Sequence, residues 1–249
     1  RGVPSFPGQI EPFLPASRFF SEPSLKPWRT YSGVGQLRID HRLGGDWILS
    51  GGMQYYKVRV KGPGVEFSAL RPDRRSITRN YSERQLDTSV LDVQANLTGT
   101  LKTGAIEHTL LFGLEYEKFR NSFWINRSRP ASDPFAIDLL APVYGQPLPP
   151  IYRASDSLSK AKAYAAYAQD QISLTAWLKL LAGFRVEKYD SYSGNGINNT
   201  SSAFKQTVVT PRFGVVILPT RNFSIYGSFA KSNKPNTAFD RFGNVLDPE

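Results

Sequence analysis

The amino-acid sequence predicts an all-β protein: an antiparallel transmembrane β-barrel, to which this chain contributes about eight strands. Hydrophobic and polar residues alternate with a period of two along most of the 249 residues. The connections between the alternating segments are short and long in turn, which is typical of outer-membrane barrels. No apolar run approaches the ~20 residues that a membrane-spanning helix needs.

The clearest strand covers residues 91–101. Its odd-numbered positions are apolar or small, and its even-numbered positions are all polar. A strand places successive side chains on opposite faces, whereas a helix would spread these residues around its circumference. The segment is therefore predicted to have one apolar and one polar face.

The same alternation predicts the other strands in chain order. We expect eight of them, near residues 28–41, 46–61, 83–101, 106–122, 160–174, 177–190, 206–218 and 222–233. Tight hairpin turns are predicted at 43–46, 102–105, 174–176 and 219–222. Long loops are expected at 62–82, 123–159 and 191–205. Tight turns at one end and long loops at the other indicate periplasmic turns and extracellular loops.

Strand length and the placement of aromatic residues indicate which face of the sheet contacts lipid and which lines the lumen. Several segments exceed the ~5–6 residues common in soluble sheets and reach the ~9–11 that cross a bilayer. Trp47, Trp177 and Phe223 directly follow tight turns, where an interfacial aromatic girdle is expected. The charged residues opposite the apolar ones should then line a wet lumen with salt bridges. They are Arg38, Asp40, Glu115, Glu117, Arg185, Glu187 and Arg212.

Composition excludes several classes of protein. The absence of Cys rules out disulfides, thiolate zinc sites and a Cys nucleophile in this chain. The net charge of +10 raises the question of nucleic acid, but no helix-turn-helix, zinc-finger or RNP-type pattern accompanies it. The densest basic stretch, residues 71–79, contains Pro and is predicted to be a loop. We therefore expect no nucleic-acid partner.

Four segments resemble the TonB-dependent siderophore receptors of the ferrichrome and pyoverdine type. Residues 169–185 are similar to that family's "QDQ, turn, Trp, Gly-x-Arg" hairpin, and 210–229 to its next hairpin. Residues 108–113 fit its "His-x-Leu-Leu-x-Gly" hairpin. Lys234-Pro235 and residues 243–249 resemble the loop and strand entry that follow. Two departures are Ile217, where the family often has Tyr, and Glu187-Lys188, which precede the expected Tyr-Asp pair.

The resemblance implies a barrel of about 22 strands with a plug inside. Residues 1–249 would form part of the barrel domain, without the plug domain and the C-terminal strands. The implied protein is a non-catalytic transporter without a cofactor or protein-bound metal, in the outer membrane of a Gram-negative bacterium. It would take up a ferric siderophore, act as a monomer, and engage the TonB complex through the missing N-terminal part.

Ligand contacts are predicted for inward-pointing loop residues. A ferric siderophore is bulky and often anionic, so its receptor needs aromatic surfaces and cations and no direct iron ligands. Phosphates of lipopolysaccharide at the outer rim are the alternative partner for the basic residues. The candidates are Arg71, Arg74, Arg75, Arg79, Tyr81, Trp124, Tyr144, Tyr152 and Arg153.

Two other outer-membrane proteins are alternatives. One is an autonomous eight-stranded barrel, an adhesin or a lipid-modifying enzyme, because eight strands can close a small barrel. Such an enzyme needs a Ser/His/acid set on the rim or outer surface, whereas His41 and His108 fall near the predicted tight turns. The other is a diffusion porin, which the family-like hairpins disfavour.

Overall fold

The computed structural model describes residues 18–129, 135–220 and 222–232. Their regular secondary structure consists of β-strands alone, and no helix among them is long and apolar enough to span a membrane. The nine strands are β1 (Arg29–Gly44), β2 (Trp47–Leu70), β3 (Ser76–Thr103), β4 (Ile106–Arg127), β5 (Phe135–Asp138), β6 (Tyr152–Ser173), β7 (Leu178–Asn195), β8 (Thr200–Thr220) and β9 (Phe223–Ala230).

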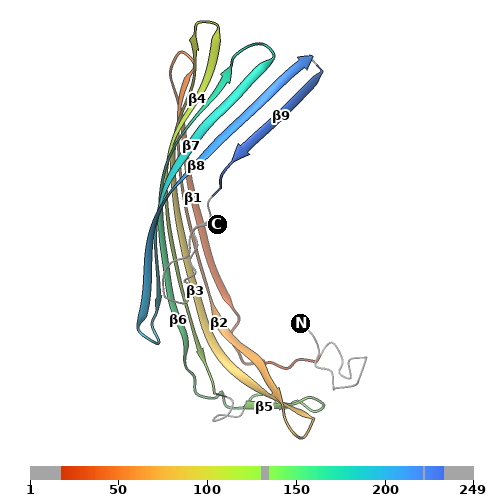
Figure 1. Ribbon diagram of the computed structural model, residues 1–249. Helices are drawn as coiled ribbons and strands as arrows, with labels where there is room; N and C mark the ends of the chain where they lie inside the picture. Colours follow the sequence, from red (N-terminus) through yellow and green to blue (C-terminus); the bar gives the residue numbers. More distant parts are fainter. Residues whose placement is uncertain (1–17, 130–134, 221, 233–249) are drawn as a thin grey trace.

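The strands form one antiparallel sheet in the order β1-β2-β3-β4-β6-β7-β8-β9, and β5 pairs with β3. Figure 1 shows a long curved sheet with tight turns at one end and β5 at the other. We call these the tight-turn end and the long-loop end. Among the described residues β1 pairs only with β2, and β9 only with β8. The sheet therefore does not close on itself after eight strands, and the alternative of an autonomous eight-stranded barrel is wrong.

Strand register separates two faces of the sheet. Phe112, Ala168 and Phe184 lie side by side across β4, β6 and β7, as part of an apolar face. Glu115, Ala165 and Glu187 form a row on the opposite, polar face. Leu114 and Phe184 remain 63% and 53% exposed on the apolar face. A soluble protein seldom exposes so continuous an apolar surface, whereas a barrel in lipid requires it.

The tight hairpin turns agree with the predictions from the sequence. Only Gly104 and Ala105 connect β3 to β4, and Gly104 has φ 65°. Gly45, between β1 and β2, has φ 55°. Such φ values suit the primed turns that match the twist of paired strands, and Gly adopts them without strain.

The predicted long loops are largely wrong. β2 and β3 extend through most of 62–82 and leave a turn at residues 71–75, and β7 and β8 extend through most of 191–205. The predicted loop at 123–159 contains β5, the end of β4 and the start of β6. Beyond the bilayer neither face of a strand contacts lipid, so the contrast between the two faces fades; at this end of β3 the side chains of Ile77, Arg79 and Tyr81 are buried by protein. The resembling segments 234–235 and 243–249 lie outside the described residues.

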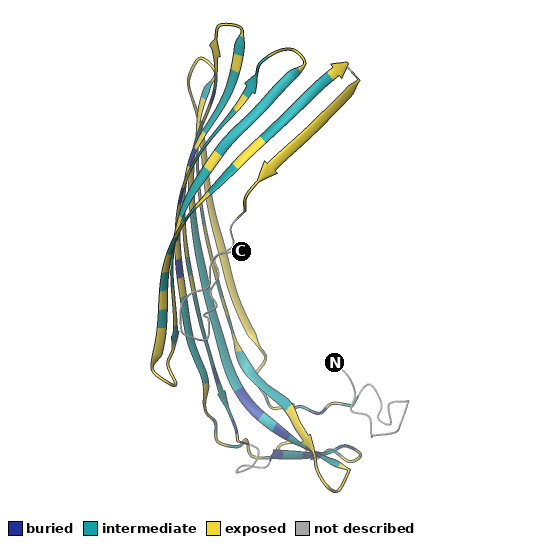
Figure 2. Cartoon of the chain, in the orientation of Figure 1, coloured by how far each residue is buried: buried dark blue, intermediate teal, exposed yellow. Residues whose placement is uncertain are grey.

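A small hydrophobic core closes the long-loop end. Phe20, Ile77, Ile137 and Leu139 form one buried cluster contributed by the segment before β1, by β3, and by β5 and the residue after it. Figure 2 shows buried residues gathered where β5 meets β2 and β3. Three stretches far apart in sequence therefore support the turn at residues 71–75.

Candidate functional site

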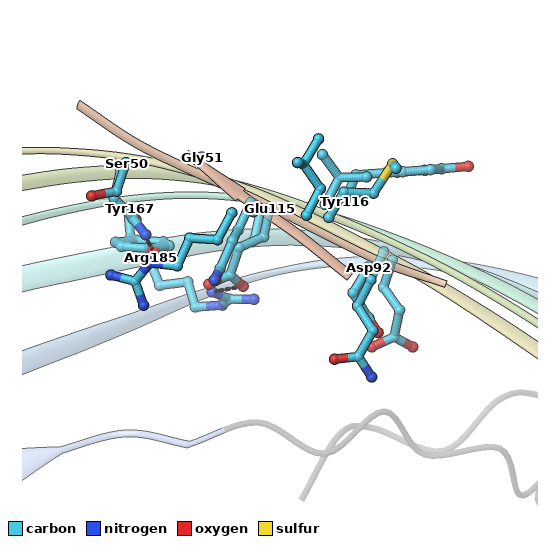
Figure 3. Close-up of a pocket in the computed structure, with 18 of the residues that line it drawn as sticks. Ser50, Gly51, Asp92, Glu115, Tyr116, Tyr167 and Arg185 are labelled. Atoms are coloured by element: carbon cyan, nitrogen blue, oxygen red, sulfur yellow. Dashed lines mark hydrogen bonds and ion pairs between the residues drawn. The ribbon is translucent and has the colours of Figure 1, made fainter. Parts of the chain in front are cut away.

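The polar face carries an ion-pair cluster centred on Arg185. Its guanidinium donates to Glu115 Oε2 at 2.6 Å and to Glu187 Oε2 at 2.8 Å, so β4 and β7 are linked across β6. Figure 3 shows Glu115, Arg185 and Asp92 projecting from the same side of the sheet. Asp92 lies directly opposite Glu117, which leaves two carboxylates side by side without a cation between them. The centre of this face is therefore charged and net acidic.

Neutral hydrogen bonds continue the same surface. The Tyr167 hydroxyl donates to Asn96 Oδ1 at 2.6 Å, and Gln36 Nε2 donates to Gln54 Oε1 at 2.7 Å. Residues of this face, together with apolar-face residues such as Leu37, Met53 and Val93, line a hollow of about 1110 Å³. A surface of this kind can hydrogen-bond water, a polar solute or another polar protein surface.

The seven charged residues that were predicted to face the lumen share this polar face. Arg38 pairs with Asp40 at 3.0 Å, and Arg212 Nη1 donates to Gln169 Oε1 at 3.4 Å. Glu115, Glu117, Arg185 and Glu187 follow the alternation described above.

The four arginines of residues 71–79 have different environments. Arg79 is fully buried in β3, where its guanidinium pairs with Glu22 at 2.8 Å and donates to the Phe20 carbonyl oxygen at 3.0 Å. It also stacks 3.9 Å from the ring centroid of Phe135. Arg79 therefore holds the segment before β1 against β5 and is not free for a ligand. Glu22 was not predicted from the sequence as the partner of Arg79, because nothing in the sequence around Glu22 indicates an ion pair with a residue 57 positions away.

The other three arginines lie in the exposed turn between β2 and β3. Arg75 pairs with Asp138 at 2.5 Å, and Asp138 also accepts backbone N–H bonds from Leu140 and Ala141. The bonds from these backbone groups and from Arg75 lower the pKa of Asp138. Arg71 and Arg74 form no side-chain ion pair within the described part of the chain, so they are the turn cations available to a ligand.

The turn has its own hydrogen-bond framework around Asp73. Its carboxylate accepts bonds from the Ser76 hydroxyl at 2.5 Å and from the backbone N–H groups of Arg75 and Ser76 at 3.0 Å each. These bonds, the Ser76 hydroxyl first, lower the pKa of Asp73 to about 2. The turn thus presents Arg74, at φ 51°, on a backbone that an Asx-type network holds in place.

The aromatic candidates form separate pairs. The Tyr81 hydroxyl donates to Glu83 at 2.8 Å, and the Tyr144 hydroxyl donates to the Phe19 carbonyl oxygen at 2.7 Å. Arg153 lies 4.8 Å from the centroid of the Trp124 ring. The Tyr152 ring stacks with the guanidinium of Arg129, which lies two residues after the end of β4, at 4.1 Å from the ring centroid.

The loop assignment is wrong for five of the nine candidates. Trp124 in addition fails the prediction of an inward-pointing side chain. The alternation along β4 places Trp124 on the apolar face, opposite to Glu115. Arg71, Arg74, Arg75 and Tyr144 do lie outside strands. The five candidates in strands are Arg79, Tyr81, Trp124, Tyr152 and Arg153.

Comparisons with known proteins agree with this geometry. The family described as "TonB dependent receptor-like, beta-barrel" matches residues 4–249. The chain is 36% identical over 242 residues to the metal-pseudopaline receptor CntO of Pseudomonas aeruginosa, covering 95% of this chain and 34% of that protein. It is 27% identical to the ferrioxamine B receptor of Salmonella typhimurium, covering 84% of this chain and 29% of that protein.

Solved structures show the same fold at low sequence identity. The FpvAI–pyocin S2 complex matches with a TM-score of 0.73 at 16% identity, covering 94% of this chain and 32% of the other. The ferric-catecholate import receptor Fiu from K12 E. coli matches with a TM-score of 0.69 at 16% identity, covering 90% and 36%. The chain thus spans about a third of the length of the curated relatives it matches.

Proposed function

Because the chain belongs to the TonB-dependent receptor-like β-barrel family, we propose that the protein containing it imports metal chelates across the outer membrane. The sheet supplies part of the barrel wall, with its apolar face in lipid and its polar face toward the lumen. No catalysis is part of this function.

The observation that carries the proposal is a broad sheet with one apolar and one polar face and with two unpaired edges. Eight main strands pair in sequence, and β1 and β9 do not meet. A barrel that continues beyond both edges is wide enough to hold a plug. The Glu115–Arg185–Glu187 cluster gives that lumen a charged, hydrogen-bonding surface, as a polar plug and a hydrated solute require.

The proposed substrate class is a metal ion wrapped by a small organic chelator. The two curated relatives are named for metal-pseudopaline and for ferrioxamine B. The ferric siderophore expected from the sequence is one member of that class. The proposed energy source is the TonB complex, which would act through a part of the protein outside this chain.

Uptake by the whole receptor tests this function. Cells that lack the gene should lose accumulation of one radiolabelled chelate from a panel of iron, zinc, nickel and cobalt complexes. Complementation should restore the uptake, and a protonophore should abolish it. Unchanged uptake for every chelate in the panel would refute the function.

Arg71 and Arg74 are the residues we propose for first contact with an anionic chelate. Replacing both with Gln in the whole receptor should weaken binding about three- to tenfold at low salt, and less at 0.5 M salt, because exposed charges are screened. Arg42→Gln with Lys102→Gln removes the same charge from exposed positions near the tight turns and serves as the control. Equal binding by both double variants would show that Arg71 and Arg74 do not contact the ligand.

A further inference from the structure

Asp170 places a carboxylate on the apolar face of the sheet, near the tight turns. It lies directly between Leu110 on β4 and Ala182 on β7. The same row continues to Gly99 on β3, which the Trp47 ring covers. Aromatic girdles flank the apolar band of outer-membrane barrels. With the tight turns on the periplasmic side, Asp170 therefore lies at the level of the headgroups of the periplasmic leaflet.

The hydrogen bonds within the fold satisfy this carboxylate only in part. His108 Nδ1 lies 2.7 Å from Asp170 Oδ2, and His108 Nε2 lies 2.9 Å from the Thr103 hydroxyl. A neutral imidazole makes both bonds, with Nδ1–H donating to Asp170 and Nε2 accepting from Thr103. Asp170 Oδ1 is buried and has no hydrogen-bond partner among the described residues. A carboxylate accepts about four hydrogen bonds, so Asp170 keeps its negative charge and unused acceptor positions.

A groove on the apolar face opens beside Asp170. Its volume of about 360 Å³ exceeds the ~300 Å³ at which ligand pockets begin. The rings of Phe184 and Phe213 are each 53% exposed at the groove, and small residues between the rings leave it open. The groove thus combines one acidic group with an apolar lining. Besides Asp170, the lining includes Phe112, Ala168, Ala182, Phe184 and Phe213.

The sheet provides no cation to offset the charge of Asp170 in its own row. An incompletely paired carboxylate on the lipid face destabilises a barrel, because lipid supplies less solvation than water. A charged donor from outside the sheet would remove this cost with a charge-assisted hydrogen bond. The other described members of the row are Gly99, Leu110, Ala182, Phe213 and Phe229.

We propose that Asp170 and the adjacent groove bind a phospholipid of the periplasmic leaflet whose headgroup carries a primary ammonium group. The ammonium group donates to the Asp170 carboxylate, and one acyl chain of the same lipid lies in the groove. A trimethylammonium headgroup has the same charge but no N–H, so the site favours the primary amine. The site lies on the outer surface of the barrel, so it requires only that the barrel spans the outer membrane and does not depend on the proposed uptake.

Lipid binding to the whole receptor tests the site. Native mass spectrometry in a neutral detergent compares dioleoyl phosphatidylethanolamine with dioleoyl phosphatidylcholine, which has the same acyl chains and no N–H in its headgroup. The unmodified receptor should bind the ethanolamine lipid about fivefold more tightly, because only the primary ammonium group donates charge-assisted hydrogen bonds.

Three variants assign this preference to the carboxylate and the groove. Asp170→Asn should reduce it to within about twofold, because the amide is neutral. The amide oxygen still accepts from His108, so the unfolding temperature in detergent alone should stay nearly unchanged. Glu107→Gln is the matched control and should keep the full preference, since Glu107 lies near the same turn on the opposite face and pairs with Lys102. Ala182→Phe fills the groove and should weaken the binding of both lipids alike.

Equal binding of the two lipids by the unmodified receptor would overturn the proposal. A preference that persists in Asp170→Asn, or that is lost equally in Glu107→Gln, would also overturn it. Thermal unfolding of the unmodified receptor with free ethanolamine separates a lipid from a soluble amine. Phosphatidylethanolamine should raise the unfolding temperature and free ethanolamine should not. Equal stabilisation by both would assign the carboxylate to a soluble amine and refute the lipid site.

Discussion

Arg79 and Arg74 are five residues apart and have opposite roles. Arg79 is fully buried against Glu22 and Phe135, whereas Arg74 is exposed at the tip of a turn. At the scale of single residues the structure therefore divides a basic stretch that looks uniform in the sequence. One part of it stabilises the long-loop end, and the other is available to a ligand.

Replacing Arg79 should loosen the long-loop end. Arg79→Gln leaves the carboxylate of Glu22 buried without its cation, which typically costs about 3–5 kcal/mol. Hydrogen exchange in the whole receptor should show loss of protection in residues 18–25 and 135–145. Arg74→Gln is the matched control and should change protection by less than about 0.5 kcal/mol. Wild-type protection in Arg79→Gln would show that the buried pair does not hold this end together.

The turn between β2 and β3 should respond to acid through Asp73. Its folded pKa of about 2 lies below the ordinary value near 3.8, so its bonds stabilise the turn fully above that value. The stabilisation is lost as pH falls from about 4 through about 2, when the carboxylate is protonated. Carboxyl-carbon NMR of selectively labelled receptor, with Asp73→Asn to assign the signal, measures this titration. A midpoint near 3.8 would contradict the hydrogen-bond network.

At the scale of whole elements, two aromatic rings cover strand glycines and link neighbouring hairpins. A Cβ on Gly113 of β4 would overlap the ring of Tyr167 on β6, and one on Gly99 would overlap the ring of Trp47. Gly113 is the glycine of the "His-x-Leu-Leu-x-Gly" segment, and the structure explains why a glycine stands there: it leaves room for the Tyr167 ring. The Tyr167 hydroxyl donates a hydrogen bond to Asn96. Close ring-over-glycine packing helps keep the register of a sheet.

Gly113→Ala should destabilise the β4–β6 pairing. The added methyl group displaces Tyr167 and costs about 1–3 kcal/mol, the range for overpacking. Heat-dependent mobility on gels or thermal unfolding of the whole receptor measures the effect. Gly35→Ala is the control, because no atom lies within 4 Å of its added Cβ. In a Tyr167→Ala background the penalty of Gly113→Ala should nearly vanish, and a full penalty there would assign it to the strand backbone.

At the scale of the whole molecule, the residues on the two faces of the sheet determine which face contacts lipid. Val93 belongs to the apolar face and Gln94 to the polar face, although they are adjacent in β3. In a soluble β-sandwich, by contrast, the apolar face of such a sheet would be buried against a second sheet. The exposure of Leu114 and Phe213, at 63% and 53%, favours lipid on the apolar side.

Spin labels can measure this orientation directly. The 249 residues contain no Cys, so a single introduced thiol is unique in this part of the receptor. A label at Val93→Cys should show high accessibility to oxygen, which partitions into lipid, and a label at Gln94→Cys should show low accessibility. The alternation should continue at Ala95 and Asn96. Equal oxygen accessibility at Val93 and Gln94 would place both faces in the same medium.

The sequence by itself determined the β class, the strands near the bilayer, the tight turns and the facing of residues such as Glu115 and Phe184. Lipid on one face and water on the other impose a period of two, and that contrast is visible in the residues. Only the tertiary structure showed that β2, β3, β7 and β8 extend beyond the bilayer, where neither face contacts lipid and the contrast disappears. It also decided that Arg79 is buried while Arg74 is free, and that His108 on β4 bonds Asp170 on β6. Those facts depend on strand register and on contacts between distant segments, which no local pattern of residues encodes.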